Sequence, residues 1–110
     1  MTEINTENFE SEVIRSKADV MVSFTADWCG FCNNTMKMLS ATERELKDVR
    51  FLFADIEKNP DLAKKYSVRG VPTTLFFKDG EMKNRKTGAL TKAEVYALAG
   101  RKTSDKVSAL

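Results

Sequence analysis

Histidine is absent from this chain, and its 110 residues include only two cysteines, two prolines and five glycines. Without histidine, the chain has no Ser-His-Asp or Cys-His catalytic group and no zinc site built on histidine. Two cysteines also fall short of the four ligands of a closed structural zinc site. We therefore expect no metal, and any catalysis must use other side chains.

Long apolar runs and an excess of charge of one sign are missing as well. No apolar stretch approaches the roughly 20 residues that cross a bilayer, and Met1 to Asn5 lack the basic start of a secretion signal. The formal net charge is only +2, with basic residues spread along the chain, which gives no footprint for nucleic acid. These features predict a cytoplasmic protein without membrane or nucleic-acid partners, in which cysteines are more often catalytic than stapling.

The length predicts a single domain over residues 1–110, large enough for one hydrophobic core. With 42% hydrophobic and 31% charged residues, the composition is that of a globular protein. Residues 101–110 show no clear pattern, and we expect them to form a frayed or flexible C-terminal tail.

Strand signals recur along the chain. Short apolar runs at 20–24, 49–56 and 73–78 are typical of strands buried in a sheet. Asp79-Gly80 then predicts a hairpin turn into a polar edge strand at 81–87. A further strand near Ile4 is only weakly indicated.

Helix signals alternate with these strands. The sequence predicts a weak helix at 7–15 with a cap near Asn5 or Thr6, and a long helix at 31–47. Asn59-Pro60 predicts a capped short helix, and Thr91 to Glu94 form a capping box before the last one. Apolar positions predicted to face inward are Phe9, Val13, Ile14, Cys32, Met36, Leu39, Leu46, Leu62, Ala63, Tyr66, Val95, Leu98 and Ala99. The order of elements predicts an α/β fold, with a mixed sheet of four or five strands and helices on both faces.

The two cysteines lie where the first buried strand gives way to the long helix, in Trp28-Cys29-Gly30-Phe31-Cys32. Cysteines three residues apart at a helix start can close a small disulfide ring. Unpaired backbone N–H groups and the helix dipole favour a thiolate at the first cysteine and lower its pKa from about 8.5 to roughly 3.5–7.5. The simpler interpretation is that two cysteines of the core have this spacing by coincidence. The preceding buried strand and Trp28 favour the redox reading, in which Cys29 attacks a disulfide and Cys32 resolves the mixed disulfide.

Several sequence blocks then make a resemblance specific. They are Ala26-Asp27-Trp28-Cys29-Gly30-Phe31-Cys32, Asn59-Pro60, Arg69-Gly70-Val71-Pro72-Thr73, Phe77-Lys78-Asp79-Gly80-Glu81 and Thr87-Gly88-Ala89. The order and spacing of these blocks resemble those of the thioredoxin family over about residues 4–100. The resemblance implies the thioredoxin fold, no cofactor beyond a redox-active Cys29–Cys32 disulfide, and a cis Val71-Pro72 peptide facing the thiols.

The resemblance also implies how substrates and electrons reach the site. Substrate proteins with disulfides would pair with the backbone of Val71 in a shallow groove. The candidate substrate-binding residues are Trp28, Gly30, Phe31, Val71, Pro72, Gly88 and Ala89, although Gly88-Ala89 can equally be a turn into the last helix. A thioredoxin reductase would supply electrons to a monomeric protein.

Four positions depart from the family pattern. Phe31 replaces the proline between the cysteines, and Lys37 replaces the proline that kinks the long helix. The family's buried acid falls at Ser23 and its partner lysine at Phe53. Removing both members of a buried charge pair can be neutral, whereas removing one leaves an unpaired charge.

These departures predict altered redox chemistry. Phe31 restores a backbone N–H near the Cys29 sulfur, and the lost acid removes a like charge. Both changes favour the thiolate, so we expect a protein less reducing than the roughly −270 mV of ordinary thioredoxin. Asp27 and Asp55 do not occupy the position of the acid, so water or the leaving thiolate would take the proton of Cys32.

Three alternatives remain open from sequence. Cys-Gly-Phe also resembles monothiol glutaredoxins, which carry serine in place of Cys32 and would use glutathione. A non-catalytic binding module could use the aromatic rings of Trp28 and Phe31 to hold a partner protein. Two chains could also share an iron–sulfur cluster through their cysteines.

Overall fold

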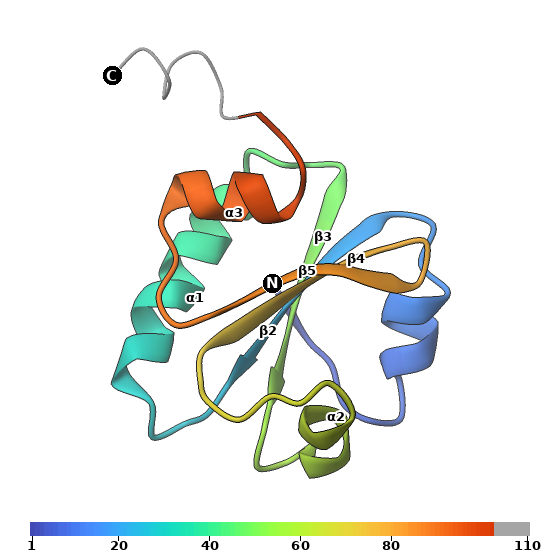
Figure 1. Ribbon diagram of the computed structural model, residues 1–110, viewed down its shortest axis with the longest axis vertical. Helices are drawn as coiled ribbons and strands as arrows, with labels where there is room; N and C mark the ends of the chain where they lie inside the picture. The colour runs from blue at the N-terminus through green and yellow to red at the C-terminus, as the bar shows by residue number, and fades with distance from the viewer. Residues whose placement is uncertain (103–110) are drawn as a thin grey trace.

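The computed structural model of the chain describes residues 1–102, and its centre is a five-stranded sheet with helices on both faces (Figure 1). Residues 103–110 lie outside the described part, so the expected tail stays a prediction for them, whereas Arg101 is held by ion pairs. The strands are β1 (Thr2–Glu3), β2 (Asp19–Thr25), β3 (Val49–Asp55), β4 (Thr73–Lys78) and β5 (Glu81–Thr87). The helices are η1 (Glu10–Ile14), α1 (Gly30–Glu43), α2 (Pro60–Lys65) and α3 (Lys92–Leu98). No helix within residues 1–102 is long and apolar enough to cross a membrane.

The sheet is mixed, as predicted, with the strand order β1-β3-β2-β4-β5. β1 and β2 both run parallel to β3, whereas β4 runs antiparallel to β2 and to β5. The weak signal near Ile4 corresponds to β1, where Thr2 lies opposite Leu52. The bounds of β4 and β5 agree with the predicted ones residue for residue.

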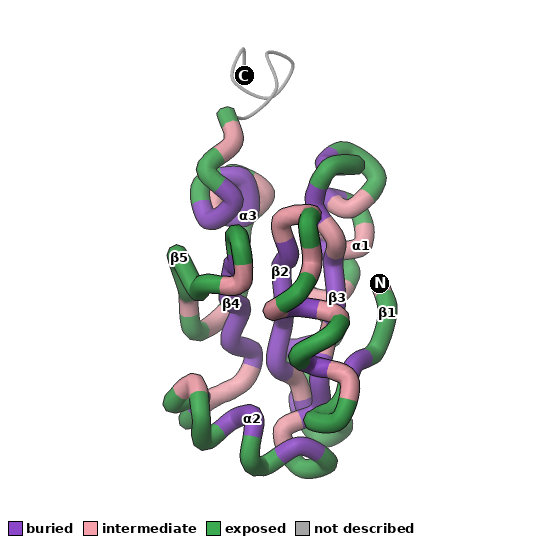
Figure 2. The backbone as a smooth tube through the Cα atoms, turned by 90° about the vertical axis from the view of Figure 1, so that its right-hand side faces the viewer, coloured by how far each residue is buried: buried purple, intermediate pink, exposed green. Residues whose placement is uncertain are grey.

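The central strand β2 is buried on both faces. Phe24 packs in one cluster with Val13 of η1 and Leu62 of α2, whereas Met21 packs in a second cluster with Leu39 of α1. In Figure 2, β2, β3 and β4 form the buried middle of the molecule. Burying an apolar side chain of this size contributes very roughly 1.5–3 kcal/mol. The two clusters therefore fix the helices on opposite faces of the sheet.

The first helix is shorter than predicted. Asn5 and Asn8 each accept the other's backbone N–H through a side-chain oxygen, at 2.9 and 2.8 Å, in the turn before η1. The helix then begins at Glu10, and its wide turn closes from the Arg15 N–H to the Glu10 carbonyl, 2.9 Å. The helix therefore begins three residues later than predicted, whereas the Asn5–Asn8 pair is a cap of the kind predicted near Asn5.

The long helix α1 begins at Gly30 and ends at Glu43, four residues before the predicted end. Its buried positions are Cys32, Thr35, Leu39 and Thr42. Met36, predicted to face inward, is only half-buried, and Thr35 takes the inward place beside it.

The predicted helix caps fare differently. Thr91 and Glu94 form the capping box at the start of α3, with hydrogen bonds of 3.2 and 2.9 Å. Asn59 precedes α2, but its side chain does not cap the helix. It instead accepts the backbone N–H of Thr6 at 2.9 Å and donates to the Asp55 carbonyl at 3.0 Å. A contact 53 residues away therefore replaces the local cap.

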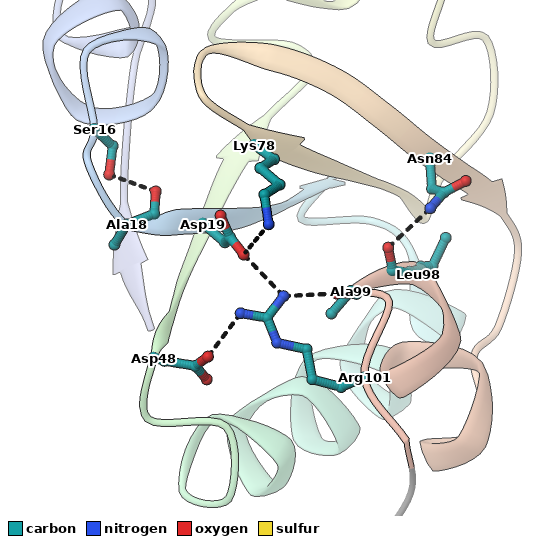
Figure 3. A network of polar contacts seen from close by, with 9 residues as sticks. All are labelled: Ser16, Ala18, Asp19, Asp48, Lys78, Asn84, Leu98, Ala99 and Arg101. Carbon is teal, nitrogen blue, oxygen red and sulfur yellow. Dashed lines mark hydrogen bonds and ion pairs between the residues drawn. The ribbon is translucent and has the colours of Figure 1, made fainter.

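Arg101 fastens the chain after α3 to the start of β2 (Figure 3). Its guanidinium lies 2.8 Å from the Asp19 carboxylate and 2.7 Å from that of Asp48. The hydrogen bond with Asp48 raises the pKa of Arg101, and the same bond lowers the pKa of Asp48. This ion-pair network holds the end of β2 that lies away from the cysteines.

A second polar contact joins the two helices on one face of the sheet. The hydroxyl of Tyr96 on α3 donates to Glu45, just beyond α1, at 2.5 Å. Lys92 contacts the other oxygen of the same carboxylate at 2.5 Å. The hydrogen bond to Glu45 raises the pKa of Tyr96 to about 12. The C-terminal end of α1 is thus bound to α3 by polar contacts as well as by the apolar cluster.

The β4–β5 hairpin turns at the predicted Asp79-Gly80. Both residues have positive φ, 53° and 78°, as a two-residue hairpin turn requires. A Cβ on Gly80 would lie 2.6 Å from the carbonyl oxygen of Ile14. The turn therefore packs against the end of η1, and only glycine fits there.

We expect Gly80→Ala to lower the free energy of unfolding by about 2–3 kcal/mol, because a left-handed conformation and a backbone clash add together. Gly100→Ala is the control, since Gly100 also has positive φ (67°) but open space around it. It should lose only about 1 kcal/mol. Urea unfolding of both variants measures the difference, and equal losses would show that the contact with Ile14 is unimportant.

Candidate active site

The junction between β2 and α1 carries both cysteines, and they form a disulfide. Cys29 is the N-cap residue of α1, with extended backbone (φ −91°, ψ 106°), and Cys32 lies in the first helical turn. Their Cα atoms are 5.3 Å apart. The strand ends, the chain turns at Cys29, and the helix brings Cys32 back beside it, as the spacing predicts.

The sulfur of Cys29 accepts a hydrogen bond from the start of the helix. The backbone N–H of Cys32 points at the Cys29 Sγ with an N···S distance of 3.2 Å. The first turn of α1 contains no acidic residue that would oppose a negative charge. This is the environment that stabilises a thiolate, because a helix N-terminus presents unpaired N–H groups and positive potential.

The two cysteines differ from their neighbours in exposure. Cys32 is 1% exposed and Cys29 is 5% exposed, so Cys29 is the more open of the pair by a small margin. Trp28 and Phe31 beside them are 67% and 75% exposed. Exposed aromatic rings of this size are unusual on a soluble surface, and they give the site an apolar rim.

The segment around Pro72 lies against the disulfide. The Val71-Pro72 peptide is cis. The carbonyl oxygen of Val71 is 3.8 Å from the Cys29 Sγ, and Val71 packs against the cluster formed by Ala26, Cys29 and Cys32. The cis peptide implied by the family resemblance is therefore present beside the sulfur atoms.

The other candidate residues are placed as follows. The Gly88 N–H donates to the Pro72 carbonyl at 2.7 Å, so the chain after β5 is bonded to the cis-proline segment. Pro72 itself is buried, whereas Ala89 is exposed. Gly30 opens α1, and a Cβ added to it would have no neighbour within 4 Å. The structure thus joins the cysteines, Val71, Pro72 and Gly88 by contacts.

Comparison with known proteins bears on what this arrangement does. A family model described as thioredoxin matches residues 1–100. The chain belongs to the thioredoxin family.

Individual thioredoxins agree over most of the chain. The thioredoxin of Acidithiobacillus ferridurans is 37% identical over 95 residues, which cover 86% of this chain and 88% of that protein. The thioredoxin of Rickettsia prowazekii is 39% identical over 82 residues, 74% of this chain and 78% of that protein. That of Pseudomonas aeruginosa is 35% identical over 91 residues, 82% and 84% respectively.

This thioredoxin-family chain is an enzyme, a thiol–disulfide oxidoreductase with a redox-active cysteine pair. The predicted family, fold class and general activity are confirmed. The glutaredoxin-like and binding-module alternatives are not favoured by these comparisons. Within residues 1–102, no cluster of three or more histidine, cysteine, aspartate or glutamate residues could hold a metal ion.

The positions where this thioredoxin departs from the family pattern are ordered and packed. Ser23 on β2 lies opposite Phe53 on β3, so the two departures from the charge pair are neighbours in the sheet. Ser23 is 1% exposed, and its hydroxyl oxygen accepts from Thr74 on β4 at 3.3 Å. A neutral hydroxyl pair occupies the buried position of the acid, and α1 runs unbroken through the exposed Lys37.

Asp55 and Asp27 do not replace the missing acid. The Asp55 carboxylate accepts the backbone N–H groups of Glu57 and Lys58 at 2.7 and 3.1 Å, and so caps the turn after β3. Asp27 is exposed. Ser23 therefore leaves the position of the family's acid without a carboxylate.

Sequence reasoning did not single out the buried threonines of this region. Thr74 lies on β4, and Thr35 lies on α1 three residues after Cys32. Their only sequence signal is position: Thr35 shares the helix face of Cys32 and Leu39, and Thr74 shares the strand face of the buried Phe76. The available signal was a polar residue at a position where the pattern of buried residues predicts an apolar one.

Restoring half of the family's charge pair should be costly. We expect Ser23→Asp to destabilise the protein by about 3–5 kcal/mol near pH 7.5, because the new carboxylate would be buried without a partner. Burial raises the folded-state pKa of such a group, so the loss should shrink as pH falls toward 4 and the carboxyl is protonated.

The double variant Ser23→Asp/Phe53→Lys is the control, since the sheet register places the two side by side. It should recover much of the stability in urea unfolding at pH 7.5. Equal stability of the single variant at pH 4.5 and 7.5 would contradict a buried, unpaired carboxylate at position 23.

Proposed function

We propose that this protein reduces disulfide bonds of other proteins, with Cys29 as the nucleophile and Cys32 as the resolving thiol. The observation that supports these roles is the hydrogen bond from the Cys32 N–H to the Cys29 sulfur at the start of α1. It favours a thiolate on Cys29, and the thiolate is the form that attacks a disulfide.

The reaction balances in two exchanges. The Cys29 thiolate attacks one sulfur of the substrate disulfide, the substrate S–S bond breaks, and the first substrate thiolate leaves. The Cys32 thiol then loses its proton and attacks the Cys29 sulfur, which expels the second substrate thiolate and closes the Cys29–Cys32 disulfide. The substrate gains two electrons, and the proton of Cys32 goes to water or to the leaving thiolate, because the floor of the site has no acid at Ser23.

The substrate segment would lie across the cis-proline side of the site. Trp28, Gly30, Phe31, Val71, Pro72, Gly88 and Ala89 are the residues that we propose contact it. The Val71 carbonyl beside the Cys29 sulfur is the backbone acceptor for an added strand. The exposed rings of Trp28 and Phe31 favour apolar side chains next to the substrate cystine.

Electrons would return to the pair from a thioredoxin reductase, and we expect the protein to act as a monomer in the cytoplasm, without cofactor, nucleic acid or membrane. The family supports protein disulfides as substrates and a reductase as donor.

Cysteine variants test the assigned roles. Cys29→Ser should abolish the acceleration of insulin reduction by dithiothreitol, because the thiolate that attacks the substrate is lost while Cys32 stays buried. Reduced Cys32→Ser, mixed with insulin without dithiothreitol, should stall at the mixed disulfide and accumulate a covalent complex with substrate, visible on non-reducing gels. Turbidity of precipitating insulin chains measures the rate. Wild-type protein that leaves insulin intact with ample dithiothreitol would refute the proposal, and the reverse pattern of the two variants would exchange the roles.

The residue between the cysteines should set the redox potential. Phe31 keeps a backbone N–H in the first turn of α1, where helical N–H groups lack intrahelical partners. This donor favours the thiolate of Cys29, and so does the neutral Ser23 at the position of the family's acid. Both therefore favour the dithiol form. We propose a potential above the roughly −270 mV of ordinary thioredoxin.

Phe31→Pro removes the N–H and should move the potential by about 10–30 mV to more negative values. Phe31→Ala keeps the N–H and removes the ring, so its potential should stay near that of the wild type. Equilibration with glutathione buffers measures all three proteins. A wild-type potential at or below the ordinary value, or an equal shift in Phe31→Ala, would show that the backbone donor does not set it.

A further inference from the structure

The hydroxyl of Thr35 is buried and has no partner. The residue is 2% exposed. Among residues 1–102, its Oγ1 is the only buried side-chain nitrogen or oxygen atom that makes no hydrogen bond. Buried hydroxyls are nearly always bonded, because an unsatisfied one has lost its water and gained nothing. The Thr35 hydroxyl therefore has no acceptor among residues 1–102 of the oxidised protein.

A second threonine on the same helix shows what is normal in this environment. Thr42 is also buried on α1, and its hydroxyl donates to the Met38 carbonyl, four residues back, at 2.7 Å. The equivalent bond for Thr35 would go to the Phe31 carbonyl, and it is not made. The nearby hydroxyls of Ser23 and Thr74 are bonded to each other. Among residues 1–102, Thr35 is thus the buried hydroxyl near the cysteines that has no acceptor.

The residue on which this donor can act is Cys32. Thr35 follows Cys32 by three positions, and both lie on the buried face of α1. Residues at this spacing on a helix have Cβ atoms about 5–6 Å apart. Helical side chains lean toward the N-terminus, so Thr35 covers the turn that contains Cys32. In the disulfide, the Cys32 sulfur is neutral and bonded to Cys29, and it is a weak acceptor.

We propose that the Thr35 hydroxyl donates a hydrogen bond to the Cys32 sulfur in the reduced protein and positions it to close the disulfide. This deepens the proposed function and rests on it only in taking Cys29–Cys32 as a pair that opens and closes. When two electrons break the S–S bond, the sulfurs separate to van der Waals contact, and Cys32 becomes a thiol or thiolate. A thiolate is a far better acceptor, and Thr35 keeps its own proton while donating to it.

Such a bond exists in one redox state only, so it changes the balance between the states. It stabilises the dithiol, whereas the same hydroxyl is unsatisfied in the disulfide. Thr35→Val, which replaces the hydroxyl by a methyl group of similar size, should therefore move the equilibrium with glutathione toward the disulfide by roughly 3- to 10-fold. Oxidised Thr35→Val should be at least as stable as the oxidised wild type in urea.

The test compares four proteins by equilibration in glutathione buffers and by urea unfolding in both redox states. They are the wild type, Thr35→Val, Thr35→Ser, which keeps the hydroxyl, and Thr42→Val as a matched control. Thr35→Ser should return to within about twofold of the wild-type equilibrium constant, the lower range of a single hydrogen bond. Thr42→Val should lose stability equally in both states and keep the wild-type potential, because its bond to Met38 does not involve sulfur.

Two results would overturn the proposal: a wild-type equilibrium constant in Thr35→Val, or an equal loss of stability in its oxidised and reduced forms. Thr35→Ala gives the same comparison should the valine variant not fold. The measurement involves no protein substrate, so it stays informative even where insulin is not reduced. Failure of insulin reduction with a shifted Thr35→Val equilibrium would refute the proposed function and leave the role of Thr35 standing.

Discussion

The site depends on one junction, where β2 leaves the core and α1 begins. Cys29 is the last extended residue and the N-cap of the helix, so the Cys32 N–H that has no intrahelical partner meets the Cys29 sulfur instead. A strand buried on both faces and a helix with its inner strip in the core hold the two ends of this junction. Redox chemistry thus occurs at a disulfide held between two elements that are anchored in the core.

Beneath the junction, hydroxyl groups stand where the family pattern has charges. The parallel pairing of β2 with β3 places Ser23 beside Phe53, so the loss of an acid and of its lysine is one change in one place. A charge pair there must be complete or absent, since one buried charge alone is costly. The Thr74 hydroxyl donates to that of Ser23, and Phe53 opposite it is half-buried. The scaffold therefore stays intact while the electrostatics of the cysteines change.

Much of this could be predicted from sequence, because the signals were local. Asp79-Gly80 defined the hairpin, the apolar run before it and the polar run after it gave the bounds of β4 and β5, and the cysteine spacing gave the helix start. Helix ends were missed by a few residues, and two other failures involve partners far along the chain. Asn59 looked like a cap, yet it bonds Thr6, and Met36 looked like a core residue, yet Thr35 lies inward. Local patterns cannot show which of two adjacent helix positions a distant sheet will cover, nor that a hydroxyl will be left without a partner.

A redox potential measures only interactions that differ between the two states of the cysteines. The ion pairs of Arg101, the aromatic packing of Phe9, and the capping box of α3 involve no atom of either cysteine, so we expect them to contribute stability and no redox selectivity. Few interactions can differ between the two redox states, and they involve groups close in the chain or in space to the cysteines. They are the N–H groups of the first turn of α1, the Val71 carbonyl, and the hydroxyl of Thr35. Substitutions around these atoms can tune the chemistry of a thioredoxin fold without altering its core.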